Sequence, residues 1–234
     1  MRGKSPVLAR LVKVSAAVLG AGLLVAGCSP VKMGAAAIVG NQRITMATLD
    51  TEVTNLSQNA QLYRSVVQLS AAQETQETLS WLVRFKINEE LAKQAGITVS
   101  SSQAQSALAQ IYATAKTQAQ SQGVSDVTLP LILVANGIPP NMGTELGRYQ
   151  AIETQYIEQL NGGKIPTASA AQTATTAKLE RAQCTAAKGL QIQINPQFGR
   201  LNYTQYEVVT VPGTVSRAGG PAKAASSSGL TPAC

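Results

Sequence analysis

The chain has 234 residues, with 19 Lys and Arg against 12 Asp and Glu, and it contains no histidine. Without imidazole, Ser-His-Asp and Cys-His catalysis, histidine metal sites and the usual physiological-pH switch are excluded. Aromatic residues make up only 4% and charged residues 13% of the chain. The core must therefore consist mainly of aliphatic side chains, which suits close-packed helices. We expect no metal and no cofactor.

The first 28 residues predict export. Four cations precede an apolar run over residues 14–25: Arg2, Lys4, Arg10 and Lys13. The run is short for a membrane span and typical of a secretion signal. It closes on Leu24-Val-Ala-Gly-Cys28, which matches a bacterial lipobox. We expect a signal peptide over 1–27, lipidation of Cys28, a tether over 28–36 and anchoring at the outer face of the cell membrane.

The alternative for this segment is an ordinary N-terminal anchor helix that happens to end on a cysteine. Cleavage would also change the charge balance. Removing the four leader cations leaves 15 basic residues against 12 acidic ones, a net charge of +3 in place of +7. The high pI of about 9.5 is therefore due largely to the basic residues of the predicted signal peptide. Because no basic cluster with interleaved aromatics follows, nucleic acid is not an expected partner.

Two cysteines, Cys184 and Cys234, remain if Cys28 is acylated. In an oxidising compartment they allow one disulfide, which would join the C-terminal tail to the end of a helix. The alternative is two unpaired thiols, because the sequence does not fix the distance between them.

The first half of the chain predicts a hairpin and three helices. Residues 37–44 favour strands interrupted by a turn at Gly40-Asn41. Thr45 suits the N-cap of a first helix. A second helix is expected over about 73–95, ended by Gly96. Ser100 and Gln103 fit the capping box that begins a third helix, closed by Gly123.

The second half predicts three more helices and a final strand. A short apolar helix covers about 129–135, a fifth runs to about residue 160, and a sixth, rich in alanine, spans about 169–187. Residues 190–194 alternate apolar and polar side chains, as a half-buried strand does. From about residue 206 this patterning stops, and we expect a flexible tail over 206–234.

The two terminal strand segments need each other, because an unpaired strand leaves its backbone groups unsatisfied. We therefore expect residues 37–44 to pair with residues 190–195. The fold class is mainly α, with five or six packed helices closed by a two- or three-stranded β element. This domain should span residues 37–205.

Three segments together resemble SurA-type and PrsA-type chaperones. AAIVGNQRITMATLD (36–50) is similar to the first strand and helix start of that family. LAKQAGITVSSSQAQ (91–105) resembles its junction between two helices, and LQIQINPQFGRL (190–201) resembles its closing strand. The resemblance covers about residues 36–203 and implies the fold of a SurA N-terminal domain.

The resemblance implies binding of unfolded or partly folded exported polypeptides. It does not extend to prolyl isomerisation, because the parvulin domain of such family members would be inserted where only residues 161–168 stand. An apolar surface between helices could hold clients. Candidate lining residues for this surface, each of which could instead be ordinary core, are Leu131, Ile132, Leu133, Ile138, Met142 and Tyr149.

Two other functions remain open. The first is a structural or assembly lipoprotein with one dedicated cell-envelope partner. The second is an enzyme, for which no convergent acid/base pair is evident: Glu89 and Glu90 are adjacent and diverge on a helix. We expect Arg84, Glu89 and Glu153 to be solvent-exposed charges, and Trp81 to be a core anchor.

Overall fold

The computed structural model describes residues 34–210. The predicted signal peptide, Cys28, most of the tether and Cys234 lie outside the described residues. The elements in chain order are β1 (Ala35–Val39), β2 (Gln42–Thr45), α1 (Met46–Leu62), α2 (Ala71–Ala95), α3 (Ser101–Ser121), α4 (Leu129–Ala135), the 3₁₀ turn η1 (Pro140–Met142), α5 (Gly143–Leu160), α6 (Ser169–Gly189), β3 (Gln193–Ile194), β4 (Arg200–Asn202) and β5 (Glu207–Val209).

Side-chain caps fix where the first helices begin. The Thr45 hydroxyl accepts the backbone N–H of Thr48 at 3.0 Å, which caps α1 as expected. Ser100 and Gln103 form the predicted capping box of α3. Ser70 forms a second capping box, with Gln73, and α2 therefore begins two residues earlier than periodicity indicated.

Strands from the N-terminal and C-terminal parts of the described chain pair in one sheet, which confirms the expected closure. The strand order is β2–β1–β3, and β1 pairs antiparallel with β3 through Ala37 with Ile194 and Ile38 with Gln193. Only two residues of the predicted strand over 190–194 are extended in this way. The reason is Gln191, two residues before β3, whose φ of 48° interrupts the extended backbone.

A second hairpin, β4–β5, corrects the expected domain boundary. Leu201 pairs with Val208, and Val208 is only 3% exposed. Its backbone N–H donates to the Ser80 hydroxyl at 2.8 Å, which attaches the hairpin to α2. Because β5 belongs to the core, the domain continues beyond residue 205; residues 211–234 lie outside the described range.

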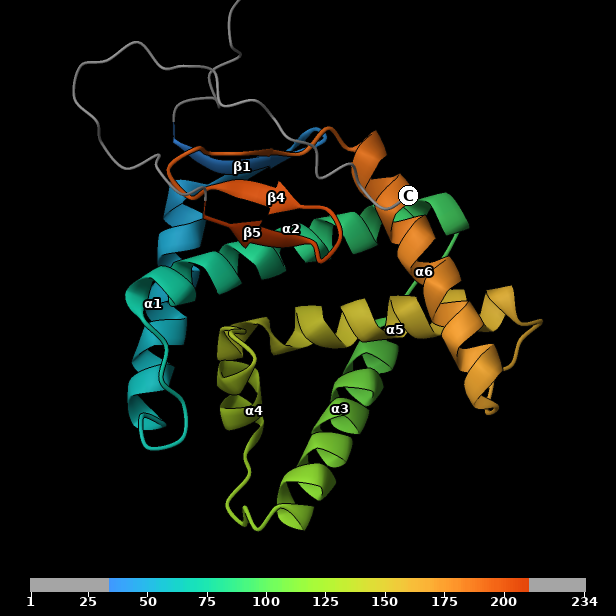
Figure 1. Ribbon diagram of the computed structural model, residues 1–234, viewed down its shortest axis with the longest axis horizontal. Coiled ribbons are helices and arrows are strands. Elements are labelled where there is room, and N and C mark those ends of the chain that lie inside the picture. The colour runs from blue at the N-terminus through green and yellow to red at the C-terminus, as the bar shows by residue number, and fades with distance from the viewer. Residues whose placement is uncertain (1–33, 211–234) are drawn as a thin grey trace, which may run out of the picture. The chain divides into compact units, whose positions relative to one another are not determined.

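Helix α2 is central to the folded unit. It contacts α1, α5 and α6 as well as strands β1 and β5. Leu79, Val83 and Ile87 bury one side of it against the sheet and hairpin. Figure 1 shows the strands on one side of α2, with α3, α4 and α5 on the other. Within residues 34–210, none of the helices combines the length and the hydropathy needed to cross a bilayer.

Candidate functional site

The six apolar residues expected to form a client-binding surface lie around α4, η1 and α5, and four of the six are buried. Leu131, Leu133, Ile138 and Met142 are 9%, 1%, 2% and 6% exposed, and are therefore core residues. They fill the space between α4 and the elements that contact it, α1, α3 and η1. In a chain with so few aromatic residues, the large aliphatic side chains form the core. Only Ile132 and Tyr149 are half-buried.

Tyr149 belongs to a group of three aromatic rings. The Trp81 centroid lies 5.6 Å from that of Phe85 and 6.0 Å from that of Tyr149. The Phe85 and Tyr149 centroids are also 6.0 Å apart, edge to face. Phe85 is buried, whereas Trp81 and Tyr149 are half-buried. The Trp81 indole donates to the carbonyl of Asn136 at 3.0 Å, which holds the ring against the end of α4.

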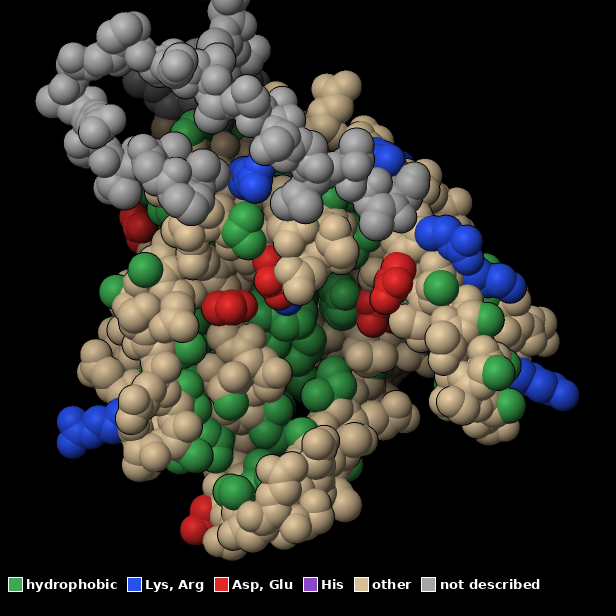
Figure 2. Space-filling model, in the orientation of Figure 1, with side chains coloured by type: hydrophobic (Ala, Val, Ile, Leu, Met, Phe, Trp, Pro, Cys, Tyr) green, Lys and Arg blue, Asp and Glu red, His purple; other side chains and the backbone are tan. Residues whose placement is uncertain are grey.

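Arg84 connects these rings to the β4–β5 hairpin. Its guanidinium carbon lies 4.8 Å from the Trp81 ring centroid. It also forms a 2.8 Å ion pair with Glu207 and donates to the carbonyl of Gln205 at 3.1 Å. Trp81 and Tyr149 therefore lie between α2, α5 and the hairpin. There, Figure 2 shows a hollow with hydrophobic side chains inside and carboxylates along its upper side in this view. We call Trp81, Arg84, Tyr149 and Glu207 the aromatic hollow.

Carboxyl groups with raised pKa values lie next to this hollow. Burial raises the pKa of Glu153, which receives a hydrogen bond from Gln183 Nε2 at 2.6 Å. Burial, followed by the charge of Glu153, raises the pKa of Tyr149. Burial and the charge of Glu207 raise the pKa of Glu77. Perturbed groups of this kind gather at functional sites and also in structural networks.

The chemistry of the hollow suits recognition. The Glu153 carboxylate accepts a hydrogen bond from Gln183, which holds it within the protein beside Tyr149. Within residues 34–210, no three Asp, Glu or Cys side chains are grouped closely enough to hold a metal ion. Two half-buried rings, one cation and a carboxylate rim would contact apolar and charged parts of a ligand together.

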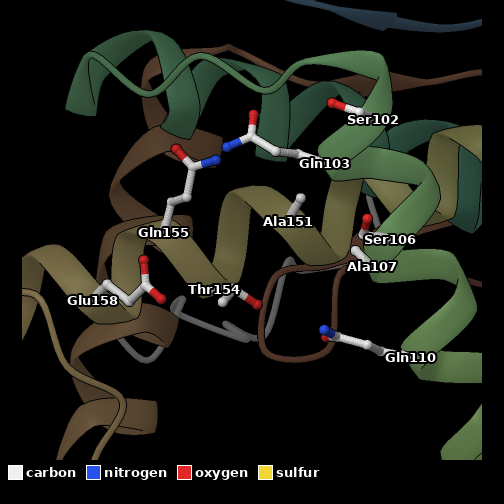
Figure 3. A pocket seen from close by; sticks show the side chains of 9 residues that line it. All are labelled: Ser102, Gln103, Ser106, Ala107, Gln110, Ala151, Thr154, Gln155 and Glu158. Atoms are coloured by element: carbon white, nitrogen blue, oxygen red, sulfur yellow. The ribbon is translucent and has the colours of Figure 1, made fainter.

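A polar cleft of about 290 Å³ lies between α3 and α5 beside their contact. Figure 3 shows Gln103 and Gln155 with their amide groups facing each other across it, and Ala107 and Ala151 on its inner side. The remaining lining residues are Ser102, Ser106, Gln110, Thr154 and Glu158. This lining offers uncharged donors and acceptors and one carboxylate but no cation, so it would repel an anion such as phosphate.

Gly147 sets the closeness of the two helices beside this cleft. A Cβ at this position would overlap the carbonyl oxygen of Ala104 and lie 3.0 Å from the Leu108 Cβ. The backbones of α3 and α5 can approach to this extent only because Gly147 has no side chain. The apolar periodicity that predicted α5 did not identify this contact.

Cys184 is 5% exposed on α6 and takes part in a disulfide. Its expected partner Cys234, like the lipidation site Cys28, lies outside the described residues. The Cys184–Cys234 pairing and the lipidation therefore stay predictions.

Sequence reasoning missed part of the hollow and the buried contact of Glu153 beside it. Arg84 and Glu153 were expected to be solvated charges, yet Arg84 bridges α2 to the hairpin and the Glu153 carboxylate is held by a buried Gln183. Comparison of the chain with protein-family models, with curated proteins and with solved structures finds no match in any of the three.

Proposed function

We propose that this chain is a lipoprotein anchored outside the cytoplasm that binds unfolded or partly folded exported polypeptides, as a binding protein and not an enzyme. It would act without prolyl isomerase activity. The aromatic hollow is the observation that carries the proposal. Half-buried apolar rings within a polar rim can accept varied side chains of an extended client.

The arrangement of the elements supports the proposal. In the SurA-type and PrsA-type chaperones that the sequence resembles, a first strand and a last strand enclose the helices. Here β1 pairs with β3, and the helices α1 to α6 lie between them in sequence. α5 is followed by α6 after a short loop, with no inserted domain. The lipobox at Cys28 supports the location.

The position of Trp81 supports the hollow as the contact site. The ring is half-buried and hydrogen-bonded at its indole nitrogen, so its remaining exposed surface is apolar. Tryptophan in such a setting contributes large contact area at low conformational cost, as at protein interfaces. Arg84, which lies over the ring and pairs with Glu207, places charged groups beside this apolar surface.

An aggregation assay tests the proposal. The purified protein, mixed at near-stoichiometric ratio with a chemically unfolded reporter, should slow the rise of light scattering. Trp81→Ala should weaken this effect and Trp81→Phe, which keeps a ring against Phe85 and Tyr149, should weaken it less. Ile165→Ala is the matched control, because Ile165 is an apolar side chain, 56% exposed, in the α5–α6 loop.

The result that contradicts the proposal is reporter aggregation at its ordinary rate in the presence of wild-type protein. Urea unfolding of each variant separates loss of binding from loss of fold. Co-purification from membranes distinguishes the assembly role: one stoichiometric partner favours it, and a broad mixture of clients favours chaperoning.

A further inference from the structure

A second cavity, of about 310 Å³, lies where β2, α1, α2, η1 and α5 meet. It uses a different stripe of α2 from the aromatic hollow, because Leu82, Lys86 and Glu89 recur at helical spacing there while Trp81 and Arg84 face the hollow. Its apolar lining comes from four residues: Ile44, Leu82, Phe85 and Met142. Met142, a residue expected from the sequence to bind clients, thus lines a cavity although its side chain is buried.

The charged groups around this cavity are mainly acidic. Three carboxylates line it, those of Glu52, Glu89 and Glu145, against the cations Arg43 and Lys86. Lys86 Nζ is 3.0 Å from Glu89 Oε2, which neutralises that pair. Arg43 has an interaction partner of its own. The surplus of one negative charge favours a cationic ligand.

Glu52 provides an independent indication of a missing donor. Its Oε2 is buried, and no hydrogen-bond donor in the described part of the chain reaches it. A buried carboxylate oxygen without a donor is costly, and such atoms are rare in folded proteins. Thr48, Asn141, Arg43 and Lys86 also line the cavity, but none of them donates a hydrogen bond to this oxygen, so a ligand with an N–H group could supply the missing donor.

We infer that this cavity binds the basic side chain of a polypeptide client, lysine or arginine. The methylene stem would lie along Leu82, Phe85 and Met142, since such stems bury readily against apolar surface. The ammonium or guanidinium group would donate to Glu52 and lie close to Glu145. The thioether of Met142 adapts to stems of different length. The inference rests on the proposed function, because it defines which segments of a client are preferred.

Two capped peptides that differ in one side chain test this inference. One is Ala-Leu-Ala-Lys-Ala-Leu-Ala, and the other has norleucine, which keeps the aliphatic stem but lacks the charge, in place of lysine. Binding of each to the full-length protein is measured by calorimetry at low salt. We expect the lysine peptide to bind about tenfold more tightly, as a charge-assisted hydrogen bond allows.

Variants locate the preference. Glu52→Gln should reduce the ratio of the two affinities to near one, while Glu158→Gln, which changes a carboxylate in the α3–α5 cleft, should leave it unchanged. Unfolding midpoints confirm that both variants are folded. Equal affinity of the wild type for both peptides would overturn the inference, and so would a lysine preference that survives Glu52→Gln.

Failure of the lysine preference and failure of client binding give different results. If unfolded reporters bind but lysine gives no advantage, the inference fails and the proposed function stands. If neither peptide nor any unfolded reporter binds, both fail. A last experiment adds phosphatidylethanolamine vesicles to the lysine peptide complex. Displacement of the peptide by the vesicles would indicate that the cavity binds a lipid amine, and this would overturn the assignment to a polypeptide.

Discussion

The side-chain amide of Asn195 donates to the carbonyl oxygen of Ala35 at 3.0 Å, although the two residues are 160 positions apart. The backbone N–H of Asn195 also donates to the carbonyl of Ala36 at 2.9 Å. Ala35 and Ala36 are both fully buried. Asn195 therefore joins the end of β3 to the beginning of β1, and the helices between them belong to one closed unit.

Asn195→Ala should destabilise the fold by about 1–3 kcal/mol, because it leaves a buried carbonyl of Ala35 without its donor. Urea unfolding monitored by circular dichroism measures the change. Gln193→Ala is the matched control: Gln193 is exposed on the same strand and should change stability by less than about 0.5 kcal/mol. Equal stability of the two variants would contradict the role assigned to Asn195.

Gly147→Ala should destabilise the α3–α5 contact by about 1–3 kcal/mol, the usual cost of overpacking, since the new Cβ would overlap Ala104. The matched control is Gly189→Ala at the end of α6, where nothing lies within 4 Å. That change should be neutral or stabilise by up to about 1 kcal/mol, as alanine favours helices over glycine. Thermal unfolding of both variants provides the comparison, and a neutral Gly147→Ala would show that the helices can separate freely.

Ser80→Ala should loosen the β4–β5 hairpin, because it removes the acceptor of the buried Val208 N–H. The expected cost is about 1–3 kcal/mol. Hydrogen exchange measured along the chain should show the largest loss of protection in residues 200–209 and a smaller loss in α5. Uniform loss across the chain would indicate that the hairpin does not open separately from the rest.

Glu153→Gln should stabilise the protein more at neutral than at acidic pH. Burial raises the folded-state pKa of Glu153 above its ordinary value of 4.5. The contribution of Glu153 to the free energy of unfolding is therefore fully present below the unfolded-state pKa, and it is lost as the pH rises through the folded-state pKa. Glutamine stays neutral throughout, so the difference in unfolding free energy should grow as pH increases from about 4. A difference that stays constant from acidic to neutral pH in urea titrations would contradict this account.

Local signals in the sequence predicted most of the helical fold. Thr45, Ser100 and Gly96 act through their immediate neighbours, so the helix boundaries they set could be read from a few residues. The short helix Leu129–Ala135 was likewise predicted from its apolar run and the Asn136-Gly137 that follows. The β4–β5 hairpin was not predicted, because strands of three residues are too short to show a period.

The candidate site was less accessible to sequence reasoning, because long-range contacts define it. Arg84 and Glu207 form an ion pair although they are 123 positions apart in the chain. The sequence around neither residue predicts this contact. Apolar character alone left Leu133 and Ile138 either as core or as part of a binding surface, and the packing of α4 shows that they are core. Tyr149 was a candidate for the binding surface and is half-buried, but its ring partners were not identified.

Trp81, the single tryptophan of the chain, reports directly on whether the aromatic hollow binds non-native polypeptide. A reporter protein without tryptophan is titrated into the purified protein, once unfolded and once native, while Trp81 emission is recorded. We predict a saturable change in emission with the unfolded reporter and none with the native one. Unchanged Trp81 emission at concentrations that suppress reporter aggregation would place client binding elsewhere and contradict the account.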